Sequence, residues 1–156
     1  MAGDRRGGRA LAGALVAAAL ASCAGPAAPP PAPVAASVAA TSRQAEALAR
    51  AALTLDAAGD GSADTLYASD ALVVANARIR VAAPRFAGVV PGGRVTIAAS
   101  TVTLQGRFAW VMMDYRWFNL ERRLAEVGRA TVICEQRPAG WRIVHAHSSQ
   151  PLPWER

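Results

Sequence analysis

The segment Gly140-Trp141-Arg142-Ile143-Val144-His145-Ala146-His147-Ser148-Ser149 decides how this chain folds. It is rich in β-branched and aromatic residues and follows the turn-forming residues Pro138 and Ala139, so it predicts a strand over residues 141–149. A similar β-prone run occupies residues 127–137, on the other side of that turn. The two runs therefore predict an antiparallel hairpin close to the end of the chain.

A second hairpin is predicted upstream, where residues 94–104 and 107–118 flank Gln105-Gly106. Before the hairpins, apolar residues recur at helical spacing from Ser42, a candidate N-cap, to the glycines at 59 and 61. The residues expected on one helix face are Leu48, Ala51, Ala52 and Leu55. A helix followed by antiparallel strands predicts an α+β domain, with one curved sheet packed on N-terminal helices.

The connection between the helix and the hairpins is less regular. It predicts a short helix at residues 62–67, a strand at 71–77 and an irregular segment at 82–93, which contains prolines and glycines. No internal repeat is visible, and residues 43–156 have the length of a single domain.

The order of these elements and their motifs resemble the SnoaL-like family of the nuclear transport factor 2-like superfamily. The motifs are the Gly-Trp-x-Ile-x-His-x-His pattern of the last strand, the strand start Gly128-Arg129-Ala130-Thr131, and Tyr67 followed by Asp70. The resemblance covers residues 43–149. It implies a cone-shaped, cystatin-like roll with a pocket between sheet and helices, and often a dimer through the sheet. It implies no activity, because this fold hosts isomerases, cyclases, dehydratases and assembly domains.

One segment departs from the family pattern. Residues 83–93 carry prolines and glycines where many relatives have a further helix over the mouth of the pocket. The lid of any family pocket is therefore not predicted from the resemblance.

The first residues predict an export signal and a lipid anchor. Arg5, Arg6 and Arg9 precede an apolar run, and Leu20-Ala21-Ser22-Cys23 has the form of a lipobox. We expect a signal peptide at residues 1–22, lipidation of Cys23, and an extended Ala/Pro-rich tether over residues 23–42. The expected location is the cell envelope, facing the periplasm, with the outer membrane favoured because Ala24 follows the cysteine.

Composition narrows the classes of partner. The net charge is +6, but every cation is an arginine and the arginines are scattered along the chain, so no nucleic-acid site is predicted. Once Cys23 is lipidated, Cys134 has no partner for a disulfide within the chain. Its place in an apolar strand predicts a buried, unreactive thiol.

Alternation along the strands predicts the candidate pocket. Trp141, Ile143, His145 and His147 should share one side of the last strand, and the two apolar residues suggest that this side faces inward. The neighbouring strands would add Trp110, Met112, Asp114, Arg116, Arg129 and Thr131 to the same interior. The opposite side of the long strand, with Val111, Met113, Tyr115 and Trp117, would form an exposed dimer interface.

These residues leave several interpretations open. Asp114 and His145 could act as proton carriers with Arg129 as a polar anchor, or the same groups could simply satisfy one another inside a small barrel. A metal site is not predicted, because the chain has only two histidines, and no cofactor motif occurs. The favoured hypothesis is a non-catalytic envelope domain that binds a small apolar ligand or a protein. The alternatives are an isomerase- or cyclase-type enzyme and a structural dimerisation module.

Overall fold

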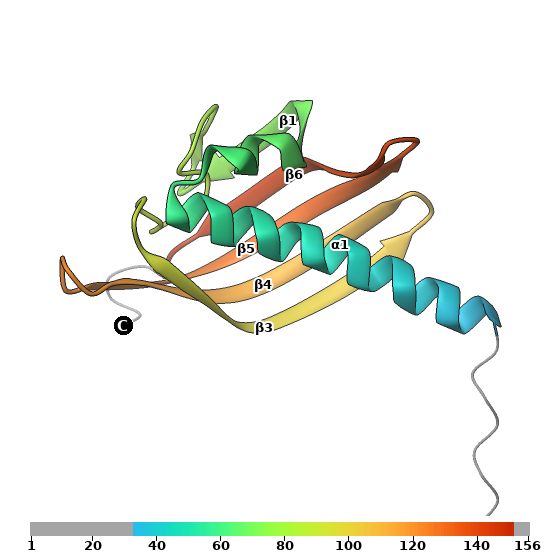
Figure 1. The fold of residues 1–156 in the computed structure, drawn as a ribbon, viewed down its shortest axis with the longest axis horizontal. Coiled ribbons are helices and arrows are strands. Elements are labelled where there is room, and N and C mark those ends of the chain that lie inside the picture. The colour runs from blue at the N-terminus through green and yellow to red at the C-terminus, as the bar shows by residue number, and fades with distance from the viewer. Residues whose placement is uncertain (1–32, 152–156) are drawn as a thin grey trace, which may run out of the picture. The chain divides into compact units, whose positions relative to one another are not determined.

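The structure is a computed structural model and describes residues 33–151. The predicted signal peptide and Cys23 lie outside these residues. In the described domain, one long helix crosses one face of a six-stranded sheet (Figure 1). None of the helices within residues 33–151 is both long enough and apolar enough to cross a membrane.

Helix α1 (Pro33–Ala58) begins earlier than the sequence predicts. Proline fits the first turn of a helix, and the alanines that follow have the highest intrinsic helix propensity. Residues 33–42, predicted to be extended tether, are therefore helical. The helix ends as predicted at Gly59, whose φ of 78° closes a Schellman turn. In that turn the Asp60 amide donates to the Leu55 carbonyl at 2.9 Å.

The strands of the two predicted hairpins follow in the predicted order. After the short helix η1 (Gly61–Leu66) come β1 (Tyr67–Ala75), β2 (Arg78–Ile79), β3 (Arg94–Gln105), β4 (Phe108–Asn119), β5 (Leu124–Arg137) and β6 (Gly140–Ser149). Strand β1 overlaps the strand predicted at residues 71–77, whereas β2 was not predicted. Their order in the sheet is β2-β1-β6-β5-β4-β3. Strands β3 to β6 pair antiparallel as expected, whereas β1 pairs parallel to β6. The predicted α+β fold with one curved sheet is confirmed.

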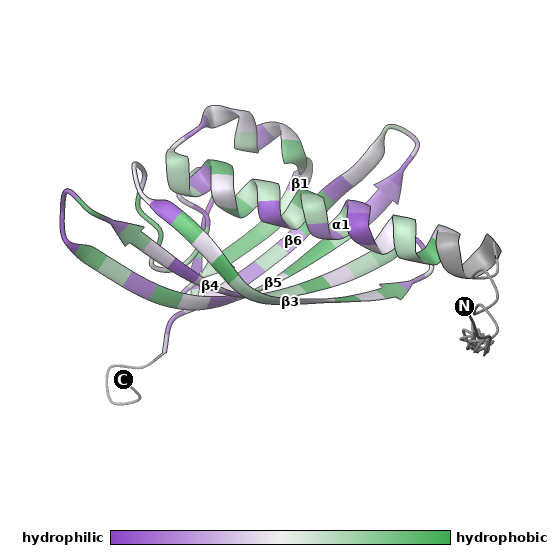
Figure 2. Ribbon diagram, turned by 60° about the horizontal axis from the view of Figure 1, so that its bottom comes forward, coloured by the Kyte–Doolittle hydropathy of each residue, from purple (hydrophilic) through white to green (hydrophobic). Residues whose placement is uncertain are grey.

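We call the sheet face beneath α1 the inner face and the opposite one the outer face. Figure 2 shows α1 lying along one side of the sheet, with hydrophobic and hydrophilic residues interspersed along the strands. Small residues on the helix, Ala45, Ala49 and Ala52, are fully buried and allow the helix to approach the sheet closely. The largest fully buried side chains on the inner face are Trp117, Tyr115, Met113, Ile143 and Val111.

Strand β6 contains a bulge that reverses its facing. His145 pairs with Ile133 and Ile143 pairs with Cys134, so Val144 is an extra residue on β6. Trp141 and Ile143 are buried on the inner face, but beyond the bulge it is Ala146 and Ser148 that are buried. The prediction that both histidines share a face with Trp141 and Ile143 is wrong, because one inserted residue shifts the alternation.

Candidate functional site

The long strand β4 faces opposite to the sequence prediction. Val111, Met113, Tyr115 and Trp117 are at most 1% exposed and belong to the core, so the prediction that they form an exposed interface is wrong. Trp110, Met112, Asp114 and Arg116 alternate with them and lie on the outer face. Both sets contain large apolar side chains, and the period alone could not tell which set α1 would cover.

Most of the predicted site residues lie together on the outer face, whereas Trp141 and Ile143 are buried on the inner face. One row across the sheet pairs Met112 with Thr131 and Thr131 with His147. A second row pairs Trp110 with Ile133 and Ile133 with His145, and a third pairs Asp114 with Arg129. The prediction of an enclosed interior that contains Asp114, Arg129 and both histidines is therefore wrong.

Asp114 and His145 do not meet on this face. Their partners on β5 are Arg129 and Ile133, four residues apart, which corresponds to about 13 Å along a strand. Asp114 is instead held by Arg129: Arg129 Nε lies 2.6 Å from Asp114 Oδ1, and Nη2 lies 3.1 Å from Oδ2. This hydrogen-bonded guanidinium lowers the pKa of Asp114.

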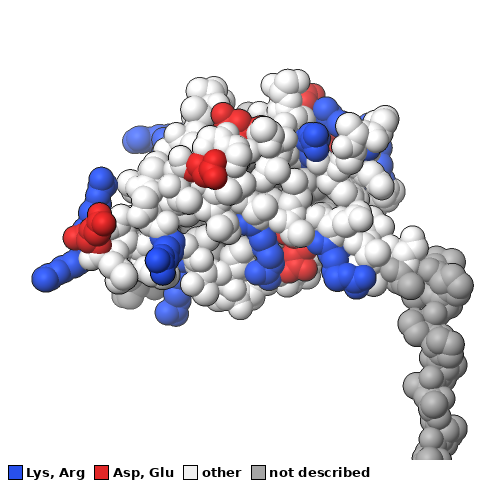
Figure 3. Space-filling view, viewed as in Figure 1, with Lys and Arg blue, Asp and Glu red and all other residues white. Residues whose placement is uncertain are grey.

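The surroundings of this outer ion pair are open. The Asp114 and Arg129 side chains are 43% and 73% exposed, and they border two shallow grooves of about 500 Å³ and 260 Å³. An ion pair so exposed to water contributes little to stability. Figure 3 shows the opposite side of the domain, on which α1 lies, and there cationic and anionic side chains are interspersed over the surface.

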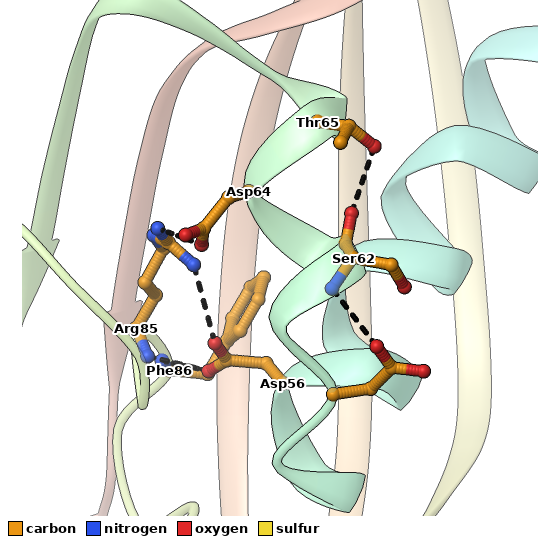
Figure 4. A network of polar contacts seen from close by, with 7 residues as sticks. Asp56, Ser62, Asp64, Thr65, Arg85 and Phe86 are labelled. Atoms are coloured by element: carbon orange, nitrogen blue, oxygen red, sulfur yellow. Dashed lines mark hydrogen bonds and ion pairs between the residues drawn. The ribbon is translucent and has the colours of Figure 1, made fainter.

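A second polar cluster lies at the C-terminal end of α1, and its centre is Asp56. Asp56 is fully buried, and its Oδ2 accepts hydrogen bonds from the backbone amides of Arg85 and, at 3.3 Å, Phe86. The Arg85 guanidinium turns back toward the same carboxylate, with Nη1 3.6 Å from Asp56 Oδ1 (Figure 4). Asp56 therefore joins the end of the helix to a loop residue distant in sequence.

Arg85 has two further neighbours. Its Nη2 donates to Asp64 Oδ1 at 2.5 Å, and its guanidinium carbon lies 4.6 Å from the centre of the Tyr67 ring. The Arg85 side chain is only 8% exposed, whereas that of Asp64 is 65% exposed. Figure 4 shows the guanidinium between the two carboxylates, one from α1 and one from η1.

Two more buried side chains hold the loop after Arg85. The Tyr115 hydroxyl donates to the Ala87 carbonyl at 2.5 Å, and the Ala87 amide donates to Ser148 Oγ at 2.9 Å. With Asp56, these contacts fix residues 85–87 against the inner face. The irregular segment predicted from its prolines and glycines is thus held in place by buried hydrogen bonds.

Burial changes the acid–base properties of the cluster. Desolvation raises the pKa of Asp56, although the Arg85 and Phe86 amides and the Arg85 charge oppose the shift. Desolvation also raises the pKa of Tyr67 above its usual range, and the Asp56 charge adds to that shift. Within the described part of the chain, three buried atoms here have no hydrogen-bond partner: Asp56 Oδ1, Tyr67 Oη and Arg85 Nη1.

An open cleft of about 330 Å³ lies beside this cluster, between η1, β1 and residues 79–81. We call it the Arg85 cleft. Its lining includes Asp64, Tyr67, Ser69, Val73, Arg80 and Arg85. No group of three metal-binding side chains occurs within residues 33–151. The lining residues of this cleft offer hydrogen bonds and charge from arginine, aspartate and tyrosine.

Sequence reasoning missed this cluster. One signal was available: Asp56 continues the buried stripe of Ala49, Ala52 and Leu53 on α1, and a charged residue on an apolar face needs a buried partner. Arg85 carried no such signal, because the loop that delivers it has no periodic pattern.

Cys134 is buried, and burial raises the pKa of its thiol to about 12.

The family of SnoaL-like domains matches residues 44–153, most of the chain. The chain belongs to the SnoaL-like family. No curated protein sequence matches this SnoaL-like chain.

Solved structures of the superfamily share the fold. An NTF2-like protein with a cystatin-like fold from Novosphingobium aromaticivorans is 15% identical, with a TM-score of 0.58 over 75% of this chain and 86% of the other. An NTF2-like superfamily protein from Salmonella enterica is 14% identical, with a TM-score of 0.60 over 74% and 94%. A ketosteroid isomerase-like protein from Erwinia carotovora is 16% identical, with a TM-score of 0.53 over 72% and 97%. At these identities the likeness concerns the fold alone.

Proposed function

We propose that this chain is a lipid-anchored envelope protein whose SnoaL-like domain binds a small molecule in the Arg85 cleft without transforming it. The observation that carries the proposal is a guanidinium only 8% exposed in the lining of an open cleft, whose Nη1 makes no hydrogen bond and has only a 3.6 Å ion pair with Asp56. Burying an arginine is unfavourable unless its hydrogen-bonding groups are satisfied. The sequence predicted a small apolar ligand. The charged residues that line this cleft favour a more polar ligand.

Native mass spectrometry of the full chain, purified in mild detergent, tests the binding proposal. Wild-type protein should retain extra mass that disappears on denaturation. Ser69→Trp, which places a bulky side chain in the cleft lining, should abolish the retained mass. Arg78→Trp, on the exposed strand β2 outside that lining, is the matched control and should keep it. Retention by Ser69→Trp, or a wild-type protein that carries nothing, would overturn the proposal.

The lipid anchor is proposed from the lipobox and has its own test. Cells that express the chain and are fed labelled palmitate should label the wild-type protein, which should sediment with the outer membrane. Cys23→Ser should remove both the label and the membrane association, whereas Cys134→Ala, which changes the other cysteine, should keep both. Labelling of Cys23→Ser would refute the anchor.

We also propose that two copies associate through the outer face. Exposed apolar side chains support this, since Met112 is 50% exposed, Leu72 48% and Val127 38%. Light scattering after gel filtration should give a dimer for the wild type and a monomer for Met112→Glu. Val81→Glu is the control, because Val81 is 93% exposed but lies outside the outer face of the sheet. A dimer that survives Met112→Glu would exclude this interface.

Acid–base catalysis is the alternative function, and the geometry favours Asp56 over the predicted Asp114 and His145 for it. Desolvation raises the pKa of Asp56, and its Oδ1 makes no hydrogen bond and lies 3.6 Å from Arg85 Nη1. A ketosteroid is a reasonable test substrate, since one structural neighbour is named ketosteroid isomerase-like. Turnover that is lost in Asp56→Asn and kept in Asp114→Asn would support this alternative. Absence of turnover in the wild type would favour binding alone.

A further inference from the structure

We propose that the Arg85 cleft binds the carboxylate of a small organic acid, and that Asp64 occupies the Arg85 guanidinium until the ligand displaces it. This inference rests on the proposed ligand-binding function and names the class of ligand. The supporting observation is that Asp56 and Asp64 both contact Arg85 but differ in burial, because the Asp56 side chain is buried and that of Asp64 is 65% exposed.

The two carboxylates have different roles. Asp56 is fully buried and accepts from the backbone amides of Arg85 and Phe86, so it cannot leave without orphaning both amides. Asp64 contacts Arg85 only through Nη2, and its side chain is 65% exposed. Asp64 can therefore turn into water with little change in its own solvation. Asp56 is the permanent partner of the guanidinium, and Asp64 is an exchangeable one.

The exchange favours a carboxylate over other ligand groups. A buried guanidinium binds carboxylates strongly because its planar fork matches their two oxygens. The ring of Tyr67 lies against the Arg85 guanidinium at 4.6 Å and fixes its plane. A ligand carboxylate that replaced Asp64 would keep the cluster's charge unchanged, whereas a neutral ligand would leave Nη2 without its counter-charge.

The rest of the cleft suits a small organic body attached to that carboxylate. Val73 and Tyr67 belong to its lining, as do Ile79 and Val81, which are 71% and 93% exposed. Arg80 adds a second positive charge to the lining. The volume of about 330 Å³ limits the ligand to a small molecule.

Isothermal titration of the full chain with benzoate tests the inference, and benzamide is the neutral analogue. Benzoate should bind at least about tenfold more tightly than benzamide, because only benzoate supplies a charge-assisted partner for Arg85. Asp64→Ala should tighten benzoate binding by roughly two- to fivefold, the range expected for removing a partly exposed competing ion pair. Benzamide binding should not change in this variant.

The matched control is Asp70→Ala. Asp70 is also on the surface, with 74% of its side chain exposed, but it pairs with Arg137 and lies outside the cleft lining. The Asp70→Ala variant should bind benzoate with the same affinity as the wild-type protein. Asp64 and Asp70 are both exposed, so both variants should remain folded, and their melting temperatures are recorded alongside.

Three outcomes overturn the inference: equal affinity for benzoate and benzamide, weaker benzoate binding in Asp64→Ala, or tighter binding of inorganic phosphate than of benzoate. These failures are distinguishable from failure of the proposed function. If native mass spectrometry finds a retained ligand that Ser69→Trp abolishes, while benzoate does not bind, only the carboxylate assignment is wrong. If neither experiment detects binding, both proposals fail.

Discussion

The outer face of the sheet and the buried cluster at the end of α1 each contain an aspartate–arginine pair, and the pKa of the aspartate is shifted in opposite directions in the two pairs. Asp114 and Arg129 approach to 2.6 Å on the outer face, yet their side chains are 43% and 73% exposed. Asp56 and Arg85 are 3.6 Å apart at the inner cluster, and their side chains are 0% and 8% exposed. The arginine lowers the pKa of Asp114, whereas burial raises the pKa of Asp56. The degree of burial, more than the distance between the charges, decides the direction in which the pKa of each aspartate shifts.

The largest expected difference between the regions is in stability. Asp56→Ala should lower the free energy of unfolding by about 3–5 kcal/mol, because it leaves Arg85 buried without its permanent partner and two amides unpaired. Asp114→Ala should change the free energy of unfolding little, because water already screens that pair. Urea denaturation followed by tryptophan fluorescence measures both. Equal losses in the two variants would break the comparison.

A glycine tests how tightly the inner face is packed. A Cβ on Gly128 would lie 2.4 Å from Cζ of the Tyr115 ring, so Gly128→Ala should destabilise the fold by about 1–3 kcal/mol through overpacking. A Cβ on Gly61 would meet nothing within 4 Å, which makes Gly61→Ala the control. Thermal unfolding of both variants gives the answer. A neutral Gly128→Ala would mean that Tyr115 can move away from the strand.

Two buried tyrosine hydroxyls differ in their hydrogen bonding: that of Tyr115 has a partner, and that of Tyr67 has none among the described residues. Tyr115→Phe removes the bond to the Ala87 carbonyl and should cost about 1–2 kcal/mol. Tyr67→Phe removes a buried hydroxyl without a hydrogen-bond partner in the described chain and should be neutral or slightly stabilising. Comparing their denaturation midpoints checks this order. A reversed order would show that Tyr67, and not Tyr115, makes the important contact.

The pH dependence of the two aspartates should differ in sign. The raised pKa of Asp56 means that its contribution is fully present below the unfolded value of 3.8 and is lost as the pH rises through the folded value. The lowered pKa of Asp114 means that its smaller contribution is present above 3.8 and is lost in acid. The destabilisation caused by Asp56→Asn should therefore shrink from about pH 3 to pH 7, while that of Asp114→Asn should grow. Melting temperatures across this range would contradict the assignment if both trends had the same sign.

The four strands of the two hairpins were predictable, because each carries its signal within a few consecutive residues, whereas the two-residue strand β2 was not predicted. The hairpin around Pro138 and Ala139 appears as β5 and β6, and the one around Gln105-Gly106 appears as β3 and β4. The facing of those strands was not predictable. Strand β4 has apolar residues on both sides, and the bulge at Val144 left no recognisable mark in the sequence.

The candidate site was predicted only in part. Asp114, Arg129, Thr131 and His147 lie near one another, as alternation required, but on the outer face. Their predicted roles as pocket residues required an interior position. Because α1 packs on the opposite face of the sheet, these residues face outward. The proton-carrier role of Asp114 and His145 stays a prediction without a shared site.

The sequence alone determined the core of the long helix, the four strands of the two hairpins and their pairing, because these properties depend on local propensity, turn residues and the spacing of apolar side chains. Only the tertiary structure decided which face became the interior, because that depends on where α1 packs. It also decided the partner of Asp56, an arginine that a non-repetitive loop brings back from 29 residues along the chain. Contacts of that kind follow from the packing of the whole domain, and no local pattern encodes them.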